Sequence, residues 1–235
     1  MEVELKDQIF QLEKLSVSFP VLEQVMNLFH KSGSSAPDIA ARVSEDPILT
    51  ARILKLANSE KYGSSGRIFT LNQAFVLAGF PALKNLLMGI LLDQLSRAGS
   101  REEEQNPDWI LHSTLVAAGA RFLARKAGYP VPGEAFVAGL LHDLGIQILI
   151  QAFPGKYLEI RSTVREQGIS YLTAEQKILG TDHAQLGGWL AESWNLPERL
   201  IRAILLHHLP DNIRPHESLT ILVHLSDAIC SYMAE

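Results

Sequence analysis

Apolar residues recur every three to four positions along most of this 235-residue sequence, and this spacing constrains the fold more than any other feature. Such spacing places apolar side chains along one face of a helix, whereas a half-buried strand alternates apolar and polar residues. No segment shows sustained alternation bounded by hairpin turns. The pattern therefore predicts an all-α fold, a multi-helix bundle of about a dozen helices.

Capping residues mark several of the expected helix ends. Asp46 followed by Pro47, and Asn106 followed by Pro107, have the N-cap and first-turn residues that begin helices, and Gly128 is placed to end the second of these. Asn58 is expected to close the helix that Asp46 begins, which is a structural role, with a binding role as the alternative. Further helices are expected at about 20–32, 37–44, 71–79, 82–96, 133–152, 155–167, 171–179, 183–194, 198–208 and 216–233.

One polar stretch interrupts this pattern. The segment "SRAGSREEEQNP" at 96–107 follows a hydrophobic helix and is typical of an exposed connector. It divides the sequence into an N-terminal helical lobe at 1–100 and a second helical lobe at 101–235.

Charge and composition limit the classes of partner. The net charge of −5 provides no field that would attract a phosphate backbone, so we do not expect nucleic acid as a partner. The start "MEVELKDQIF" lacks the features of a signal peptide, and Pro81 and Lys84 interrupt the apolar window at 74–92. We interpret that window as two core helices, and we expect a cytoplasmic protein that does not engage a membrane. The single cysteine, Cys230, suits a reducing compartment and excludes a zinc site rich in thiolates.

Histidine is concentrated in the second lobe, which holds seven of the eight histidines. Two pairs of polar residues interrupt apolar helices there: His142-Asp143 in "GLLHDLG" and His207-His208 in "AILLHHLP". Polar side chains in such a setting must be paired, hydrogen-bonded or bound to a metal ion. The sequence therefore indicates a polar centre inside this lobe.

Residues on other helices extend this set. We predict a metal centre built by nitrogen and oxygen ligands from His112, His142, Asp143, His183, His207, His208 and Asp227. Such ligands suit a divalent transition metal, namely iron, manganese, nickel or zinc. One ion, or two ions bridged by Asp143, fit the set equally. A dinuclear centre would bind phosphate oxygens and favour phosphoester hydrolysis. Gly187 and Gly188 would allow another helix to approach closely.

A simpler interpretation applies to each histidine taken singly. A histidine in a core helix is more often hydrogen-bonded than bound to metal, and His224 could pair with Asp227 one turn later. His30, His216 and His224 are expected to be surface or locally hydrogen-bonded residues, and Trp109, Trp189 and Trp194 to be core residues.

The order of the seven predicted ligands resembles that of the HD superfamily of metal-dependent phosphohydrolases, especially its HD-GYP branch. Asp108 stands where that branch can have a further carboxylate ligand. With the first lobe included, "DPILTARILKLANS", "AFVLAGF" and "WNLPERLIRAILLHH" resemble the HDOD domain, the HD-related output domain of bacterial signalling proteins. The resemblance covers about residues 15–230.

This resemblance implies an all-helical regulatory module that acts on a protein partner in a signalling pathway, with a nucleotide or phosphate as a further candidate ligand. The resemblance also implies a module of a kind generally regarded as lacking demonstrated hydrolase activity. Here Ile146 stands where the hydrolases tend to have lysine, and no Gly-Tyr-Pro follows His208. We therefore expect a metal site without turnover. The alternatives are an active phosphohydrolase acting on a nucleotide or cyclic dinucleotide, and a scaffold whose histidines only form hydrogen bonds.

Overall fold

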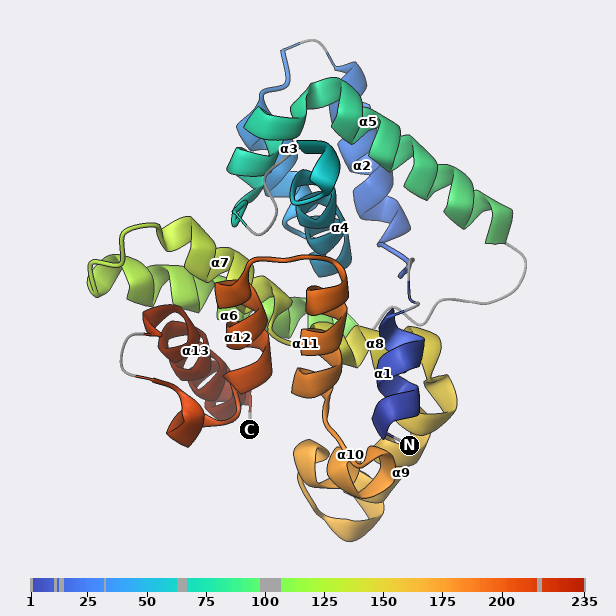
Figure 1. The fold of residues 1–235 in the computed structure, drawn as a ribbon, viewed down its shortest axis with the longest axis vertical. Coiled ribbons are helices and arrows are strands. Elements are labelled where there is room, and N and C mark those ends of the chain that lie inside the picture. Colours follow the sequence, from blue (N-terminus) through green and yellow to red (C-terminus); the bar gives the residue numbers. More distant parts are fainter. Residues whose placement is uncertain are drawn as a thin grey trace.

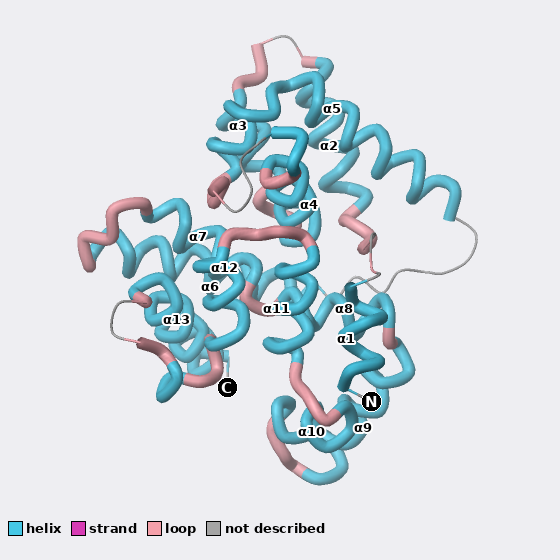
Figure 2. The backbone as a smooth tube through the Cα atoms, viewed as in Figure 1, coloured by secondary structure: helices cyan, strands magenta, loops and turns pink. Residues whose placement is uncertain are grey.

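The computed structural model describes residues 2–10, 12, 15–31, 33–62, 67–97, 107–214 and 217–234. Within these ranges the chain forms helices joined by loops and turns, without a strand (Figure 2). The prediction of an all-α fold is confirmed. The helices are α1 (Glu2–Phe10), α2 (Phe19–His30), α3 (Ala36–Val43), α4 (Pro47–Ala57), η1 (Glu60–Tyr62), α5 (Leu71–Arg97), α6 (Pro107–Lys126), α7 (Pro132–Leu141), α8 (Leu144–Ala152), α9 (Pro154–Gln167), α10 (Tyr171–Leu179), α11 (His183–Ser193), α12 (Glu198–Leu206), η2 (Pro210–Asn212) and α13 (Ser218–Ala234).

Helices α2 to α5 pack together as one lobe, drawn in blue to green at the top of Figure 1. Their starts follow the capping residues in the sequence. The Asp46 side chain accepts a hydrogen bond from the backbone N–H of Leu49 at 2.8 Å, as expected for an N-cap before Pro47. Asn58 ends α4, where its side chain bonds backbone groups of Leu54, Arg67 and Ile68.

Helix α5 has a sharp break. Gly79 lies in the left-handed region of φ, at 73°, where glycine is favoured, and Pro81 follows it. This confirms two helical pieces within the window at 74–92. Both pieces bury one face in the core, at Phe75 and Leu87, and expose apolar residues on the other, with Val76 87% and Leu92 61% exposed.

Within the part of the chain that the structure describes, two stretches are long and apolar enough to cross a membrane by length and composition, Leu71–Leu92 and Pro132–Ala152. The break at Gly79 interrupts the first. In the second, 72% of the most apolar window is buried inside the protein, as in the core helix of a soluble fold.

Helices α6 to α13 form the second lobe, and α1 packs against its helix α11 (Figure 1). The Lys6 ammonium lies 5.7 Å from the ring centroid of Trp189, which places α1 on this lobe although it precedes α2 in sequence. Most of the connector predicted at 96–107 lies outside the described residues, so the lobe boundary stays a prediction.

Polar contacts join the two lobes. The Gln151 side chain accepts a hydrogen bond from the Ser16 backbone N–H at 2.7 Å and donates one to the Ser16 carbonyl at 3.1 Å. On another part of the interface, the Arg199 guanidinium lies 4.5 Å from the ring centroid of Phe69. Arg199 also reaches the buried Glu134 carboxylate at 3.3 Å. The contacts of Gln151 with Ser16 and of Arg199 with Phe69 therefore join the second lobe to the segment 15–97.

Candidate metal centre

The helix predicted at 133–152 is broken at its two polar residues. Helix α7 ends at Leu141, and Asp143 has φ −97° and ψ 22°, outside helical geometry, before α8 begins at Leu144. The prediction of one continuous helix was therefore wrong at His142 and Asp143. Adjacent residues inside a helix point about 100° apart, and the break allows both side chains to face one centre. Helix α12 likewise ends at Leu206, before His207 and His208.

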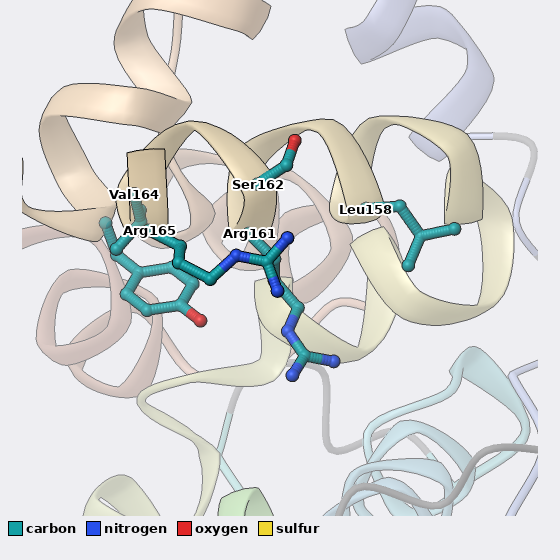
Figure 3. A pocket seen from close by; sticks show the side chains of 6 residues that line it. Leu158, Arg161, Ser162, Val164 and Arg165 are labelled. Carbon is teal, nitrogen blue, oxygen red and sulfur yellow. The ribbon is translucent and has the colours of Figure 1, made fainter. Parts of the chain in front are cut away.

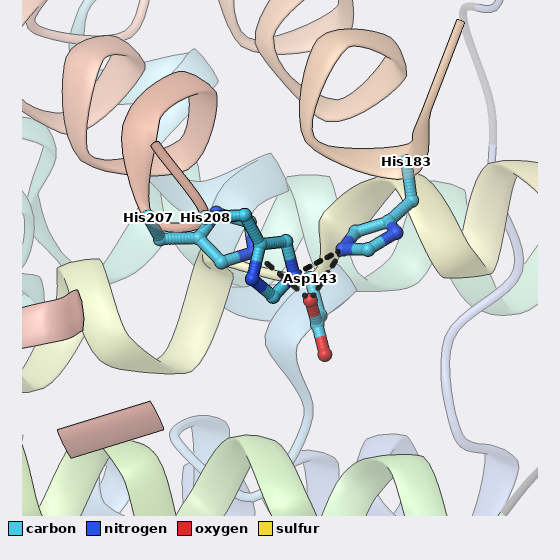
Figure 4. A group of neighbouring side chains, drawn as sticks. All are labelled: Asp143, His183, His207 and His208. Carbon is cyan, nitrogen blue, oxygen red and sulfur yellow. Dashed lines mark hydrogen bonds and ion pairs between the residues drawn. The ribbon is translucent and has the colours of Figure 1, made fainter. Parts of the chain in front are cut away.

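The structure brings all seven predicted residues together in two groups, within each of which the candidate ligand atoms lie within 4.8 Å of one another. Figure 4 shows three histidines from the ends of two helices around the Asp143 carboxylate. We call this group the first half of the centre: Asp143, His183, His207 and His208. The second half consists of His112, His142 and Asp227.

Asp143 lies between the two halves. Its Oδ1 is 3.2 Å from Nε2 of His183 and 3.5 Å from Nε2 of His207. Its Oδ2 is 3.3 Å from Nε2 of His142 and 3.6 Å from Nε2 of His112. One carboxylate thus presents a different oxygen to each half, which is the arrangement of a bridging ligand.

Asp227 closes the other side of the centre. Its Oδ1 lies 3.2 Å from Nε2 of His112, and its Oδ2 lies 3.6 Å from Nδ1 of His208. His224 does not take the place of these partners, because its Nδ1 bonds the carbonyl oxygen of His207 at 2.6 Å. The expected local pair of His224 with Asp227 is therefore replaced by a hydrogen bond to the backbone of a ligand candidate 17 residues away.

Hydrogen bonds fix the orientation of three buried imidazoles. Nδ1 of His142 donates to the Gly139 carbonyl at 2.8 Å, and Nδ1 of His207 donates to the Ile204 carbonyl at 2.6 Å. These carbonyl oxygens can only accept, so each Nδ1 must carry the proton. Nδ1 of His183 is 2.7 Å from the Glu175 carboxylate. In the neutral form, each ring therefore directs the lone pair of Nε2 at the centre, as metal-binding histidines do.

Hydrogen bonding within the protein leaves one of these three Nε2 atoms, that of His207, unsatisfied. Among the described residues, Nε2 of His207 is buried without a hydrogen-bond partner. Nε2 of His112 lies 3.3 Å from Nε2 of His142, and Nε2 of His183 lies 3.0 Å from Nε2 of His208. Four imidazole nitrogens therefore converge within hydrogen-bonding distance of another ring, and the unpaired Nε2 of His207 is the atom that fits a metal ion better than a hydrogen-bonded scaffold.

Burial and charge act in opposite directions on the titrating groups. Burial, with the neighbouring His207 and His183, lowers the pKa of His208 to about 3. Burial also favours the neutral form of His183, but hydrogen bonds to the Asp143 and Glu175 carboxylates raise its pKa well above the usual value. Burial would raise the pKa of Asp143, yet the histidines around it, His142 first, hold that pKa well below its usual range. Asp143 therefore supplies a negative charge for a cation.

Close backbone packing positions the two helices that carry Asp143 and His183. A Cβ atom on Gly145 would lie 1.9 Å from the His183 carbonyl oxygen, and one on Gly187 would lie 3.0 Å from the Gly145 nitrogen. A Cβ on Gly188 would meet the Leu205 side chain of α12 at 2.2 Å. Gly187 and Gly188 thus allow close helix approach, as predicted.

Access to the centre is limited to one side. The side chains of His112 and His208 are 27% and 26% exposed, whereas those of His142 and His207 are fully buried. Among the described residues, the ion pairs of Asp143 and Asp227 involve histidines only. Ile146, where the hydrolases tend to have lysine, is half-buried and packs against the core. Position 146 therefore supplies no positively charged side chain to the centre.

A separate cavity of about 430 Å³ lies along α9 and α10, where Arg161 and Arg165 extend from α9 (Figure 3). Its lining contains none of the seven candidate ligands. The cavity is therefore distinct from the candidate metal centre.

The remaining predictions have mixed outcomes. Trp109, Trp189 and Trp194 are buried, as expected of core residues, and Nε1 of Trp109 also donates to the Asp143 carbonyl at 3.2 Å. The side chains of Asp108 and His30, and the whole of His216, lie outside the described residues.

Sequence reasoning missed Glu175, which is buried beside His183. The available signal was an acidic residue four positions before the buried Leu179, on the buried face of α10.

Similar proteins support the fold. An uncharacterized protein of Treponema pallidum is 28% identical over 183 residues, which are 76% of this chain and 35% of that protein, so the chain spans about a third of its relative's length. The MmoQ response regulator of Methylococcus capsulatus is 24% identical, with a TM-score of 0.74 over 95% of this chain and 89% of that one.

A virulence factor of Campylobacter jejuni is 20% identical, with a TM-score of 0.77 over 98% of this chain and 83% of that one. At these identities the two solved structures show a common fold. The model of the HDOD domain family matches residues 16–210, and this chain therefore belongs to the HDOD family.

Proposed function

We propose that this chain is a signalling module that holds one or two divalent transition-metal ions in its second lobe and regulates a protein partner without hydrolase turnover. The observation that carries the metal half is the position of Asp143, whose two oxygens face separate groups of histidines. A solved structure with the same fold bears the name response regulator, which supports the signalling half. We place its action in the cytoplasm, away from membranes and nucleic acid.

Each half of the centre offers a complete set of donors. His183, His207 and His208 with Oδ1 of Asp143 would hold one ion, and His112, His142 and Asp227 with Oδ2 of Asp143 would hold the other. Imidazole and carboxylate donors suit iron, manganese, nickel or zinc. A bound ion would supply Lewis acidity and a positive charge to the centre.

The surroundings of the centre favour binding over turnover. Phosphoryl chemistry relies on cationic groups that stabilise the charge of the transition state. Ile146 provides no such group, and the described ion pairs of Asp143 and Asp227 involve no lysine or arginine. We therefore infer that a metal ion or a bound phosphate ligand biases the interaction with the partner, and that chemistry is not the output.

The bridging position of Asp143 also favours a second candidate, a phosphohydrolase acting on a nucleotide or cyclic dinucleotide, because dinuclear centres bind phosphate oxygens. A substrate screen distinguishes the two functions by comparing the turnover of manganese- or iron-loaded wild type with that of a matched His112→Ala variant. For a regulatory module we expect no turnover above that of the variant. Turnover that His112→Ala abolishes would establish the hydrolase instead.

A further inference from the structure

Glu175 is a buried carboxylate in direct contact with one ligand candidate. Its residue is 1% exposed, on α10, beneath the start of α11. Its Oε2 accepts hydrogen bonds from both Nδ1 and the backbone N–H of His183, at 2.7 and 3.0 Å. Its one ion pair among the described residues is with His183. Burying a carboxylate costs free energy unless hydrogen bonds or opposite charges compensate the lost hydration. The two hydrogen bonds from His183 therefore stabilise Glu175 in its buried position.

This contact distinguishes His183 from the other anchored histidines. His142 and His207 donate Nδ1 to the neutral carbonyls of Gly139 and Ile204, whereas His183 donates to a charged acceptor. A carboxylate behind a metal-binding histidine fixes the ring and strengthens its opposite nitrogen as a donor. That opposite nitrogen, Nε2, lies 3.2 Å from Oδ1 of Asp143, in the first half of the centre.

We propose that Glu175 is a positioning residue that strengthens metal binding by the first half of the centre, acting through His183, and leaves the second half unaffected. The proposal rests on the metal function proposed above. It makes the two halves unequal, because among the described residues the hydrogen bonds and ion pair of Glu175 go to His183 and to no residue of the second half, which is His112, His142 and Asp227.

A purely structural role gives a different expectation. Glu175 also accepts the N–H of His183, the first residue of α11, where Asp182 is the N-cap and bonds the Gln185 N–H at 3.0 Å. If helix capping were its whole role, loss of its charge would alter stability and leave metal affinity unchanged.

The test uses Glu175→Gln, because the amide oxygen can still accept both hydrogen bonds while the charge is lost. Metal-free wild type and variant are titrated with cobalt(II), followed by calorimetry and by the visible spectrum of the bound ion. We expect one ion to bind the variant at least about tenfold more weakly with an altered spectrum, and any second ion to bind unchanged. Ser170→Ala is the matched control, since it removes the N-cap of the same helix without touching His183.

A His183→Ala background tests whether Glu175 acts through His183. Adding Glu175→Gln to that background is expected to change cobalt affinity by less than about twofold. If Glu175→Gln does not fold by circular dichroism, Glu175→Asp replaces it, with the same expected weakening because the shorter side chain loses its reach.

Three results would overturn the proposal in distinguishable ways. Equal cobalt affinities and spectra in wild type and Glu175→Gln contradict the role of Glu175 while leaving the metal function intact. An equal loss in Ser170→Ala, or an undiminished effect of Glu175→Gln without His183, shows that α10 acts by stability alone. Failure of the wild type to bind cobalt contradicts the proposed metal function itself, and the role of Glu175 with it.

Discussion

Gly145 and His183 touch backbone to backbone, because a Cβ atom on Gly145 would lie only 1.9 Å from the carbonyl oxygen of His183. This contact holds α8 against α11, and it sets the distance between the carboxylate of Asp143 and the ring of His183. The geometry of the candidate metal centre therefore depends on Gly145, a position that carries no ligand candidate.

Gly145→Ala should strongly destabilise the protein, because the clash is with backbone that can move only if α11 shifts. We expect the free energy of unfolding to fall by about 3 kcal/mol, measured by urea denaturation. Gly155→Ala is the matched control, since a Cβ there meets nothing within 4 Å, and its stability should be unchanged or slightly higher. Equal stability of the two variants would show that the helices do not pack as described.

Asn58→Ala should weaken the first lobe. The fully buried Asn58 side chain donates to the Leu54 and Ile68 carbonyls and accepts the N–H groups of Arg67 and Ile68. Its loss leaves buried polar groups unpaired, which should cost about 3 kcal/mol in thermal or urea unfolding. Ser59→Ala removes one hydrogen bond to the Leu56 carbonyl and should cost about 1 kcal/mol. Similar costs for both would contradict a special role of Asn58.

Metal uptake should release protons and strengthen as pH rises. Burial opposes charge on His142 and His183, but the neighbouring carboxylates raise the pKa of both. Raised pKa values stabilise the metal-free fold below the unfolded value of about 6.5, and this stabilisation is lost as pH rises through the folded pKa. A metal ion must displace these protons. Calorimetry in buffers of different ionisation enthalpy should therefore show net proton release at pH 7, and none would contradict histidine ligation.

The sequence predicted most of what capping and periodicity control. Pro47 after Asp46 located the start of α4, and the interruption of apolar helices by His142 and His207 located the centre. A buried polar pair is costly unless it is satisfied, so such interruptions are informative without a structure.

The features that the sequence did not predict are those that depend on contacts between helices. The run around His142 is apolar on all sides, so no periodicity marks the point where the helix breaks. Helix α1 is short and mixes apolar with acidic and basic residues, and its Leu5 and Ile9 are buried where it packs against the second lobe. Glu175 resembles a solvent-exposed acidic residue until α11 places His183 over it.

The metal content of the purified protein tests the central claim most directly. Inductively coupled plasma mass spectrometry of the wild type should find about one or two equivalents of transition metal per chain. Asp143→Ala removes the carboxylate that faces both halves and should bring the content close to zero, whereas Asp211→Asn, at an exposed aspartate, should retain it. A wild type without stoichiometric metal, or an Asp143→Ala variant that keeps its metal, would contradict the account.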